Sequence, residues 1–343
     1  MSDPVPPSPP AARRRKAATI RDVAQAVGVS TATVSKFING GQRFSREVED
    51  RLTAAIRELG YVSNPMARGM ITGQTGNVGI VILDILNPHF TSLVKGASRV
   101  AQQAGLNLLF ADVAEGQLPE LAMLQALSRR VDGLIVSARL SDPSIEWLAQ
   151  AGPPTVYYGG RPGPHQGHSV GVDSFEAAQM LGRHLRELGH RRVAYVGFSG
   201  ARWSAQRWAG LCAAFEGSGA ALQVHDVRAP TPEEGERVAS AVLLAAAPPD
   251  AVVAYNDLLA LGLMGQAAAL GLRVPEDVSV AGFDNILYAR YAHPPLTTVD
   301  MAGETMGATA MQRLVERVRG GPEDGQHDAL APRVLARGST RRR

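Results

Sequence analysis

The sequence predicts an α/β protein in which a small N-terminal unit of three helices precedes two doubly wound α/β subdomains. Three short amphipathic helix patterns with capping residues lie within residues 19–62. From residue 78 onward, strand-like runs alternate with amphipathic helices, which is typical of parallel sheets covered on both faces. A chain of 343 residues is also too long for one hydrophobic core. We therefore expect a cleft between two subdomains.

The composition is that of a soluble globular protein, with 45% hydrophobic and 20% charged residues. The single cysteine, Cys212, excludes an internal disulfide framework and fits the cytoplasm; we expect it to be a small buried residue on a helix. Residues 1–18 are rich in proline and alanine and end in a basic run, so we expect a disordered basic tail. No signal peptide and no membrane-spanning stretch is predicted.

The first helix pattern begins with a capping box. The Thr19 hydroxyl is placed to accept from the backbone of Asp22, whose carboxylate favours the helix N-terminus. Apolar residues follow at helical spacing: Ile20, Val23, Ala24 and Val27. Gly28 permits a sharp turn, and Ser30 is a suitable N-cap for the next helix.

The second helix pattern has two different faces. Val34, Phe37 and Ile38 lie on one face, which predicts packing against the other helices. Ala32 and Lys36 are four residues apart and share the opposite face. This outer face is available to contact a partner.

A third helix pattern completes the unit. Ser45 is its expected N-cap and Gly60 its end, and its apolar stripe comprises Val48, Leu52, Ile56 and Leu59. The three patterns predict a helix-turn-helix DNA-binding headpiece over residues 19–62. Residues 1–70 hold 11 Lys and Arg against 6 Asp and Glu, which suits a module that faces phosphate. The alternative is an ordinary three-helix cap with a solvated polar face.

Four motifs carry a family resemblance: Thr-Ile-Arg-Asp-Val-Ala, Gly-Val-Ser-Thr-Ala-Thr-Val-Ser, Ile-Asn-Gly and Glu-Leu-Gly-Tyr-Val-Ser-Asn-Pro-Met-Ala-Arg. With these motifs the chain, from Thr19 to about Arg337, resembles the lactose-repressor (LacI/GalR) family of bacterial transcription regulators. We therefore expect base-edge contacts from Thr31, Ala32 and Lys36. Phosphate contacts are expected from Ser30, Thr33 and Asn39.

Residues 63–76 form the predicted hinge helix and linker. Asn64 is a suitable cap and Pro65 suits the first helical position, but two turns alone are too short to be stable. The resemblance implies a hinge helix that orders on operator DNA and enters its minor groove, with contacts from Ala67 and Met70. Met70 stands where relatives carry a leucine wedge, and Ser63 where a proline is common.

The larger part, residues 77–338, contains the alternating pattern. Its predicted strands are 78–83, 107–111, 133–137, 155–158, 169–172, 192–196, 223–227, 251–254, 279–281 and 333–337, and its predicted helices are 89–104, 118–129, 174–188, 204–216, 233–246, 257–270 and 303–319. The resemblance implies the periplasmic-binding-protein type I fold, in which the chain crosses between the subdomains three times. We assign the N-subdomain to about 77–173 and 301–330, the C-subdomain to about 174–300 and 331–338, and a basic tail to 339–343.

Ligands of such sheets bind beyond the carboxyl ends of the strands, so residues just after strands are the candidates. The candidate effector-binding residues are Asn87, Phe90, Asp173, Arg207, Asn256 and Asp284. The resemblance supports three of them, namely Arg207, Asn256 and Asp284, while Asp173 is equally well explained as a helix cap. A guanidinium, a carboxylate and an amide favour a sugar or sugar-like metabolite over a nucleobase or an acid. Aromatic rings that offer an apolar face, or belong to the core, are Phe90, Tyr158, Trp203 and Tyr288.

Enzyme and metal signatures are weak. No dinucleotide-binding or P-loop motif occurs, and no cofactor is expected. Residues 167–171 match the nucleophile-elbow motif around Ser169. A nucleophile elbow needs a strand before the serine and a helix after it, whereas here a loop rich in proline and glycine precedes Ser169. His165 and His168 have no second ligand pair, so no metal site is predicted.

The sequence therefore predicts a ligand-responsive transcription regulator, with repression the expected direction. It would bind a pseudo-palindromic operator in the cytoplasm and be associated with the nucleoid. We expect a homodimer, because no leucine heptad follows residues 333–337 to build a larger assembly. Two alternatives belong to other classes: an exported, periplasmic-type solute receptor, and a hydrolase that uses Ser169.

Overall fold

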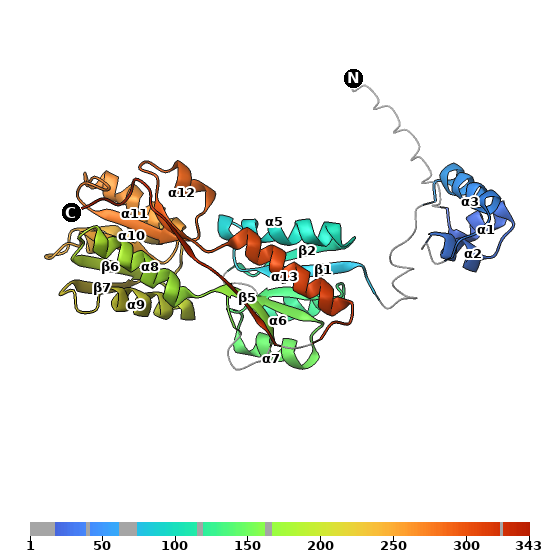
Figure 1. The fold of residues 1–343 in the computed structure, drawn as a ribbon, viewed down its shortest axis with the longest axis horizontal. Helices are drawn as coiled ribbons and strands as arrows, with labels where there is room; N and C mark the ends of the chain where they lie inside the picture. The colour runs from blue at the N-terminus through green and yellow to red at the C-terminus, as the bar shows by residue number, and fades with distance from the viewer. Residues whose placement is uncertain (1–17, 39–41, 62–73, 115–118, 162–166, 323–324) are drawn as a thin grey trace, which may run out of the picture. The chain divides into compact units, whose positions relative to one another are not determined.

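The computed structural model describes residues 18–38, 42–61, 74–114, 119–161, 167–322 and 325–343 (Figure 1). The chain divides into two units, residues 1–75 and residues 76–343, which are considered separately. Part of the predicted DNA-contacting set, namely Asn39, Ala67 and Met70, lies outside the described residues, as does the predicted hinge helix.

The first unit contains α1 (Ile20–Val27), α2 (Thr31–Ile38) and α3 (Arg46–Leu59). The predicted capping box is confirmed, since the Thr19 N–H donates to the Asp22 carboxylate at 2.7 Å and the Asp22 N–H donates to the Thr19 hydroxyl at 3.4 Å. Gly28 ends α1 with φ of 72°, a conformation that glycine adopts without strain. The Ser30 hydroxyl accepts from the Thr33 N–H at 3.1 Å, so the predicted cap of α2 is also present.

A small apolar core joins these three helices. Its buried members are Val23, Ala24, Val27, Val34, Leu52 and Ala55. Arg51 adds a polar link, because its Nη2 donates to the Val27 carbonyl at 2.6 Å, at the C-terminal end of α1 where a cation is favourable. The packing of α2 through Val34 leaves its opposite face to solvent.

Two details of α3 differ from the sequence prediction. Ser45 occupies the N-cap position but its side chain makes no capping hydrogen bond. Glu49 instead accepts from the Phe44 N–H at 3.1 Å, which satisfies a backbone donor just before the helix. Leu59, predicted to belong to the apolar stripe, is 40% exposed because it lies in the last turn, beyond the three-helix core.

The second unit contains two six-stranded sheets. The strands of the first are β1 (Asn77–Ile82), β2 (Asn107–Asp112), β3 (Leu134–Ser137), β4 (Thr155–Tyr158), β5 (His168–Val172) and β11 (His327–Leu330), all parallel, in the order β11-β5-β4-β3-β1-β2. Those of the second are β6 (Arg192–Gly197), β7 (Ala221–Asp226), β8 (Ala251–Ala254), β9 (Ser279–Phe283), β10 (Thr297–Asp300) and β12 (Arg333–Leu335), in the order β12-β10-β9-β8-β6-β7. Only the β10–β12 pair among the described strands is antiparallel.

Helices cover both faces of each sheet (Figure 1). The first sheet is covered by α5 (Pro88–Gln103) and α13 (Gly303–Val318) on one face and by α6 (Glu120–Ser128) and α7 (Asp142–Ala151) on the other. The second is covered by α8 (Ser174–Glu187) and α9 (Arg202–Phe215), and by α10 (Pro232–Leu243) and α11 (Asp257–Ala269), with a short α12 (Leu287–Tyr291) near its end. The chain crosses between the sheets after β5, after β10 and after β11, which confirms the expected architecture.

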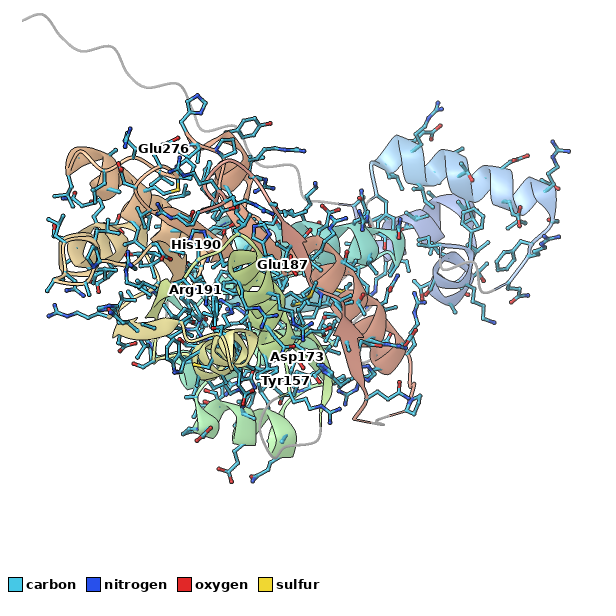
Figure 2. The ribbon with its side chains drawn as sticks, turned by 60° about the vertical axis from the view of Figure 1, so that its left-hand side comes forward. Tyr157, Asp173, Glu187, His190, Arg191 and Glu276 are labelled. Atoms are coloured by element: carbon cyan, nitrogen blue, oxygen red, sulfur yellow. The ribbon has the colours of Figure 1, made fainter. Side chains whose placement is uncertain are left out.

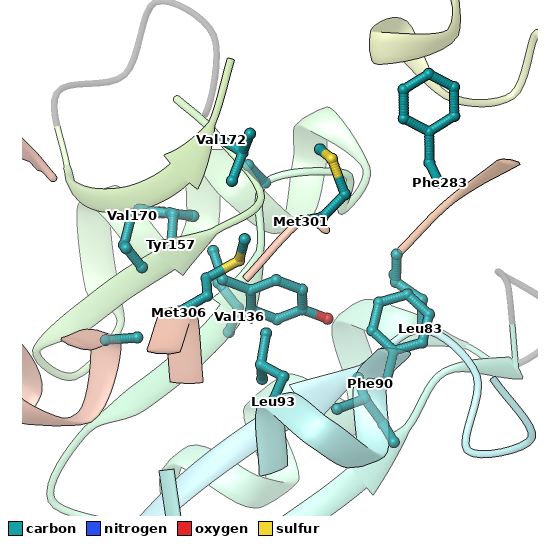
Figure 3. Packing of buried hydrophobic residues seen from close by; sticks show 14 of the residues in the cluster. Leu83, Phe90, Leu93, Val136, Tyr157, Val170, Val172, Phe283, Met301 and Met306 are labelled. Carbon is teal, nitrogen blue, oxygen red and sulfur yellow. The ribbon is translucent and has the colours of Figure 1, made fainter. Parts of the chain in front are cut away.

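The carboxyl end of the first sheet is closed by its own apolar core. Leu93 of α5, Val136 of β3 and Met306 of α13 belong to one buried cluster (Figure 3). Leu83 and Phe90 extend the same cluster to the segment where β1 ends and α5 begins. The loop between β1 and α5 is thereby anchored at both ends.

The C-terminal residues do not form the predicted basic tail. Ser339 is fully buried, and its hydroxyl accepts from the Thr297 N–H at 2.7 Å and donates to the Val280 carbonyl at 2.6 Å. The Arg343 N–H donates to the Leu188 carbonyl at 2.8 Å. These residues belong to the second subdomain, because they form hydrogen bonds with backbone groups of its strands and helices that would otherwise have no partner. The lone cysteine also differs from expectation, since it is exposed on α9.

Two glycines of α11 offer a matched stability test. A Cβ added at Gly262 would lie 1.9 Å from the Pro232 carbonyl oxygen, where α10 packs closely against α11. One added at the exposed Gly265 would meet nothing within 4 Å. We expect Gly265→Ala to stabilise the core by about 0.5–1 kcal/mol through helix propensity, and Gly262→Ala to destabilise it by about 1–3 kcal/mol through overpacking. Urea unfolding of both variants checks this, and stabilisation by both would contradict the close helix contact.

Candidate functional site

A small cavity lies between the two sheets, beyond the carboxyl ends of their strands. Each sheet reverses its winding direction at a central pair of strands, β1 and β3 in the first and β6 and β8 in the second, so the following loops diverge there. The cavity measures about 60 Å³. Its lining residues are Leu83, Asn87, His89, Phe90, Ser137, Arg139, Tyr158, Gly159, Trp203, Arg207, Pro230, Tyr255, Asn256 and Asp284.

The structure brings five of the six candidate effector residues to this cavity. They are Asn87, Phe90, Arg207, Asn256 and Asp284. Asp173 is not among the lining residues. Its carboxylate caps α8, where Oδ1 accepts from the N–H groups of Phe175 at 2.8 Å and Glu176 at 3.0 Å. Asp173 is labelled in Figure 2. The capping role expected for Asp173 is present, and its part in ligand binding stays a prediction.

Arg207 is held firmly in the wall of the cavity. Only 4% of the residue is exposed, and its guanidinium carbon lies 4.7 Å from the ring centre of Tyr255 and 4.3 Å from that of Phe283. Its Nη1 donates to the Tyr255 carbonyl. Its buried Nε has no hydrogen-bond partner within the described part of the chain. A buried donor without a protein partner is costly, so this group is suited to bind a ligand acceptor.

Asp284 faces the cavity from a strained loop. Its φ is 106° and that of the following Asn285 is 54°, values that residues other than glycine rarely adopt and that often mark functional sites. Burial raises the pKa of the Asp284 carboxyl, while the nearby positive charges of His89, Arg207 and Arg139 lower it. The His89 Nδ1 lies 3.8 Å from the carboxylate.

Asp257 supports this loop from behind. Its carboxylate is completely buried and accepts from the Ile286 N–H at 2.9 Å and from the Thr298 hydroxyl at 2.6 Å. Burial raises the pKa of Asp257 well above its usual range, and the neighbouring charge of Asp284 raises it further. Asp257 thus fixes the loop that presents Asp284.

The two asparagines of the site have double roles. The Asn256 Oδ1 accepts from the Leu259 N–H at 2.9 Å, and its Nδ2 donates to the Pro230 carbonyl at 2.9 Å, so the side chain caps α11. The Asn87 Oδ1 likewise accepts from the His89 N–H at 3.0 Å and caps α5. Each amide has hydrogen-bonding capacity beyond these bonds, because an amide offers two N–H donors and two acceptor lone pairs.

Several lining residues were not selected from the sequence. Arg139 follows β3, is half-buried, and has its guanidinium carbon 5.3 Å from the ring centre of Phe198. The rule that selected the other candidates, a polar residue just after a strand, also applies to Arg139. Among the suggested aromatic residues, Tyr158 and Trp203 line the cavity with Phe90, whereas Tyr288 is 57% exposed and does not.

The outer face of α2 has the exposure that the headpiece prediction requires. The residues Ser30, Thr31, Ala32 and Lys36 are exposed, and Thr33 is half-buried. The Ser30 and Thr33 hydroxyls lie 2.9 Å apart. The Lys36 ammonium donates to the Gln42 side-chain carbonyl at 3.3 Å. The side chains proposed to contact bases therefore point away from the apolar core.

Ser169 has no geometry for nucleophilic catalysis. It is the second residue of β5, is 1% exposed, and its hydroxyl lies 2.9 Å from the Nδ1 of His327 on the adjacent β11. A catalytic serine must be exposed at a turn after its strand. Across the residues that the structure describes, there is also no group of three or more His, Cys, Asp or Glu side chains able to hold a metal ion.

Replacement of Asp284 by asparagine tests the raised pKa of its carboxyl. A carboxyl whose pKa is higher in the folded state favours folding when protonated, so its contribution is present below the unfolded-state pKa and is lost as the pH rises through the folded-state pKa. We expect the wild type to lose stability relative to Asp284→Asn as the pH rises above about 4, the pKa of a carboxyl in the unfolded chain. Urea unfolding across this range measures the difference. If the wild type instead gained stability relative to Asp284→Asn as the pH rises, the neighbouring positive charges would lower the pKa of Asp284 by more than burial raises it.

The fold and the cavity define a class of protein that joins a helix-turn-helix headpiece to a periplasmic-binding-protein-like core. Residues 19–64 match the family model for bacterial regulatory proteins of the lacI family, and residues 183–340 match that for the periplasmic binding protein-like domain. The transcriptional repressor CytR of Escherichia coli (strain K12) is 30% identical over 337 residues, which cover 96% of this chain and 98% of CytR. The chain therefore belongs to the LacI family of bacterial regulatory proteins.

Solved structures agree with this assignment. The lac repressor dimer bound to operator and the anti-inducer ONPF superposes with a TM-score of 0.83 at 25% identity, over 95% of this chain and 100% of that chain. The regulator CelR in complex with cellobiose gives a TM-score of 0.69 at 29% identity, over 94% and 99% of the two chains. The protein is thus a DNA-binding, ligand-responsive repressor rather than an enzyme. Among the described helices, none combines the length and apolarity needed to cross a lipid bilayer.

Proposed function

We propose that the protein represses transcription as a homodimer on a pseudo-palindromic operator, and that a sugar-like metabolite bound in the cavity changes its affinity for DNA. The observation that carries this proposal is the cavity itself, which is lined by Arg207 of α9, Asn256 at the start of α11 and Asp284 in the loop after β9. The CelR–cellobiose and lac repressor–operator complexes, which share the fold, support both halves of the proposal.

On the DNA side, α2 would enter the major groove. Thr31, Ala32 and Lys36 would contact base edges, since all three are exposed on the face opposite the core. Phosphate contacts are assigned to Ser30, Thr33 and Asn39, and minor-groove contacts to Ala67 and Met70. Phosphate contacts position the headpiece, whereas base contacts determine the sequence that it reads.

The dimer would bury an apolar surface of the core. The short helix α12 exposes three large apolar or aromatic side chains, Leu287 at 63%, Tyr288 at 57% and Tyr291 at 72%. Adjacent exposed side chains of this kind mark interaction surfaces, and a two-fold operator requires a second copy of the same chain. We assign the protein to the cytoplasm, where its DNA lies.

In the cavity, the ligand would bind through its hydroxyl groups. The Arg207 guanidinium would donate to ligand hydroxyls and the Asp284 carboxylate would accept from them, and Trp203 and Phe90 supply apolar surface. A volume of 60 Å³ is well below the roughly 300 Å³ of an ordinary ligand pocket. We infer that the ligand enters a wider cleft, which would couple its binding to the angle between the subdomains.

The deciding experiment is selection of genomic DNA fragments by the purified full-length protein at one fixed salt concentration, followed by footprinting. The proposal expects a pseudo-palindrome that is protected in two adjacent major grooves and contacted at its centre from the minor groove. Candidate metabolites are then added to the same assay. Weak, sequence-independent binding that disappears steeply with salt, both with and without metabolites, would refute the proposal.

A further inference from the structure

Arg202 connects the two subdomains beside the cavity. It is the first residue of α9 in the second subdomain, and its Nη2 donates to the carbonyl of Ala138 at 3.0 Å. The same nitrogen donates to the carbonyl of Arg161. Ala138 directly follows β3 and Arg161 lies beyond the end of β4, so one side chain of the second subdomain holds two loops of the first. Arg202 is not one of the residues that line the cavity, so these bonds do not use the groups that would bind a ligand.

The neighbouring Trp203 packs against the first subdomain at the same place. A Cβ added at Gly159 would lie 3.4 Å from the Trp203 ring, and one added at Gly160 would lie 3.5 Å from it. Both glycines follow β4 and have a positive φ, 85° and 138° respectively. The guanidinium carbon of Arg202 lies 5.1 Å from the centre of the Trp203 ring. The guanidinium is therefore restricted to a position from which it reaches both carbonyls.

The surroundings of Arg202 favour the same arrangement of the subdomains. Burial lowers the pKa of the guanidinium by removing part of its hydration, while the negative charge of Asp142 raises it. Asp142 is the first residue of α7, in the first subdomain. If the subdomains moved apart, Arg202 would leave both carbonyls and this opposite charge. Ala138 is 2% exposed, so its carbonyl would also need a new hydrogen-bond partner.

We propose that Arg202 is a latch that holds the two subdomains in the narrow arrangement and thereby sets the operator affinity of the protein before a ligand binds. The inference rests on the proposed function, in which the ligand enters a wider cleft, and it concerns the protein's own conformational balance rather than the chemistry of the ligand. A cavity of about 60 Å³ is too small for a sugar-sized ligand, so opening has to break the Arg202 bonds before the ligand enters.

The strength of this latch would also determine how the protein responds. A ligand shifts an equilibrium between two arrangements only by the difference in its affinity for them. Each hydrogen bond that stabilises the narrow arrangement therefore adds to the binding free energy that a ligand of the wide arrangement must supply. Arg202 acts here as a positioning residue, because it acts through the angle between the subdomains.

The test measures the distance between the subdomains by pulsed electron spin resonance of the full-length protein, with no ligand added. Cys212, which is exposed on α9, and Ala149→Cys, at an exposed position on α7, place one spin label in each subdomain. Labelled chains are mixed with an excess of unlabelled protein, so that distances within one chain are recorded. We expect Arg202→Gln to raise the ratio of the wide to the narrow arrangement by about threefold to tenfold, and Arg202→Lys to retain part of the latch.

The matched control is Arg183→Gln, which removes the same charge from an exposed site on α8. The Arg183 guanidinium donates to Gln179 of the same helix at 2.8 Å, so its loss should leave the distance between the subdomains unchanged. Footprinting without ligand gives the second measurement. The operator affinity should change by several-fold in Arg202→Gln and stay at the wild-type value in Arg183→Gln.

Three results would overturn the inference: a distance distribution in Arg202→Gln equal to that of the wild type, an equal shift in Arg183→Gln, or a shifted distance with unchanged operator affinity. Arg202 is exposed, so its replacement leaves the apolar core intact, and urea unfolding verifies this for each variant. If the distances do not change while the wild type protects its operator, the latch fails and the proposed function stands. If Arg202→Gln widens the cleft but the wild type binds no operator, the proposed function fails instead.

Discussion

Replacing Arg207 with alanine is expected to abolish the response to ligand while operator binding persists. The side chain supplies charge-assisted donors inside a buried cavity, so its loss should weaken ligand binding by about 100-fold or more. The headpiece has its own apolar core in a separate unit of the chain, and it does not depend on Arg207 for its fold. Footprinting with increasing concentrations of the identified ligand measures both properties in one assay.

Because Arg207 also packs between Tyr255 and Phe283, its removal leaves a cavity as well as a missing charge. Arg207→Met separates the two effects, since methionine keeps much of the side-chain volume but provides no donors. Ligand binding should be lost in both variants, whereas Arg207→Met should unfold at a higher urea concentration than Arg207→Ala. Equal loss of DNA binding and ligand response in a correctly folded variant would remove Arg207 from the proposed site.

Elements with strong local signals were predictable from the sequence. The capping box of Thr19 and Asp22 and the turn at Gly28 need only neighbouring residues to form, and both are present.

Elements whose formation depends on residues far away in the chain are not predictable from their own sequence. The strand β11 is short and partly exposed and exists through pairing with β5, more than 150 residues earlier in the chain. Ser339 is similar, because its burial depends on Thr297 and Val280 rather than on its own neighbours.

The candidate site was predictable to the extent that topology determines it. Arg207, Asn256 and Asp284 follow from the rule that ligands bind beyond the carboxyl ends of parallel strands, together with the family resemblance. The same rule selects Asp173, whose carboxylate also caps α8, and sequence spacing alone does not separate a helix cap from a ligand contact. Arg139, two residues after the end of β3, obeys the same rule and lines the cavity, but its neighbours there, such as Phe198, come from distant parts of the chain.

The second large effect concerns the headpiece. Lys36→Ala is expected to lower affinity for the selected operator by about tenfold to 100-fold, because Lys36 is proposed to contact a base edge from the exposed face of α2. Competition binding at a fixed salt concentration, with the operator and a scrambled sequence of equal length, measures the loss as a specificity ratio.

The matched control is Arg57→Ala, on the exposed end of α3. Each substitution removes one positive charge from the headpiece, so the general attraction to phosphate should fall by a similar amount in both. A loss of specificity in Lys36→Ala alone then reflects base recognition rather than charge. If both variants lose affinity equally for operator and scrambled DNA, Lys36 contacts the backbone. Sequence reading would in that case rest on Thr31, Ala32 and the shape of the DNA, which offer fewer direct hydrogen bonds to the bases.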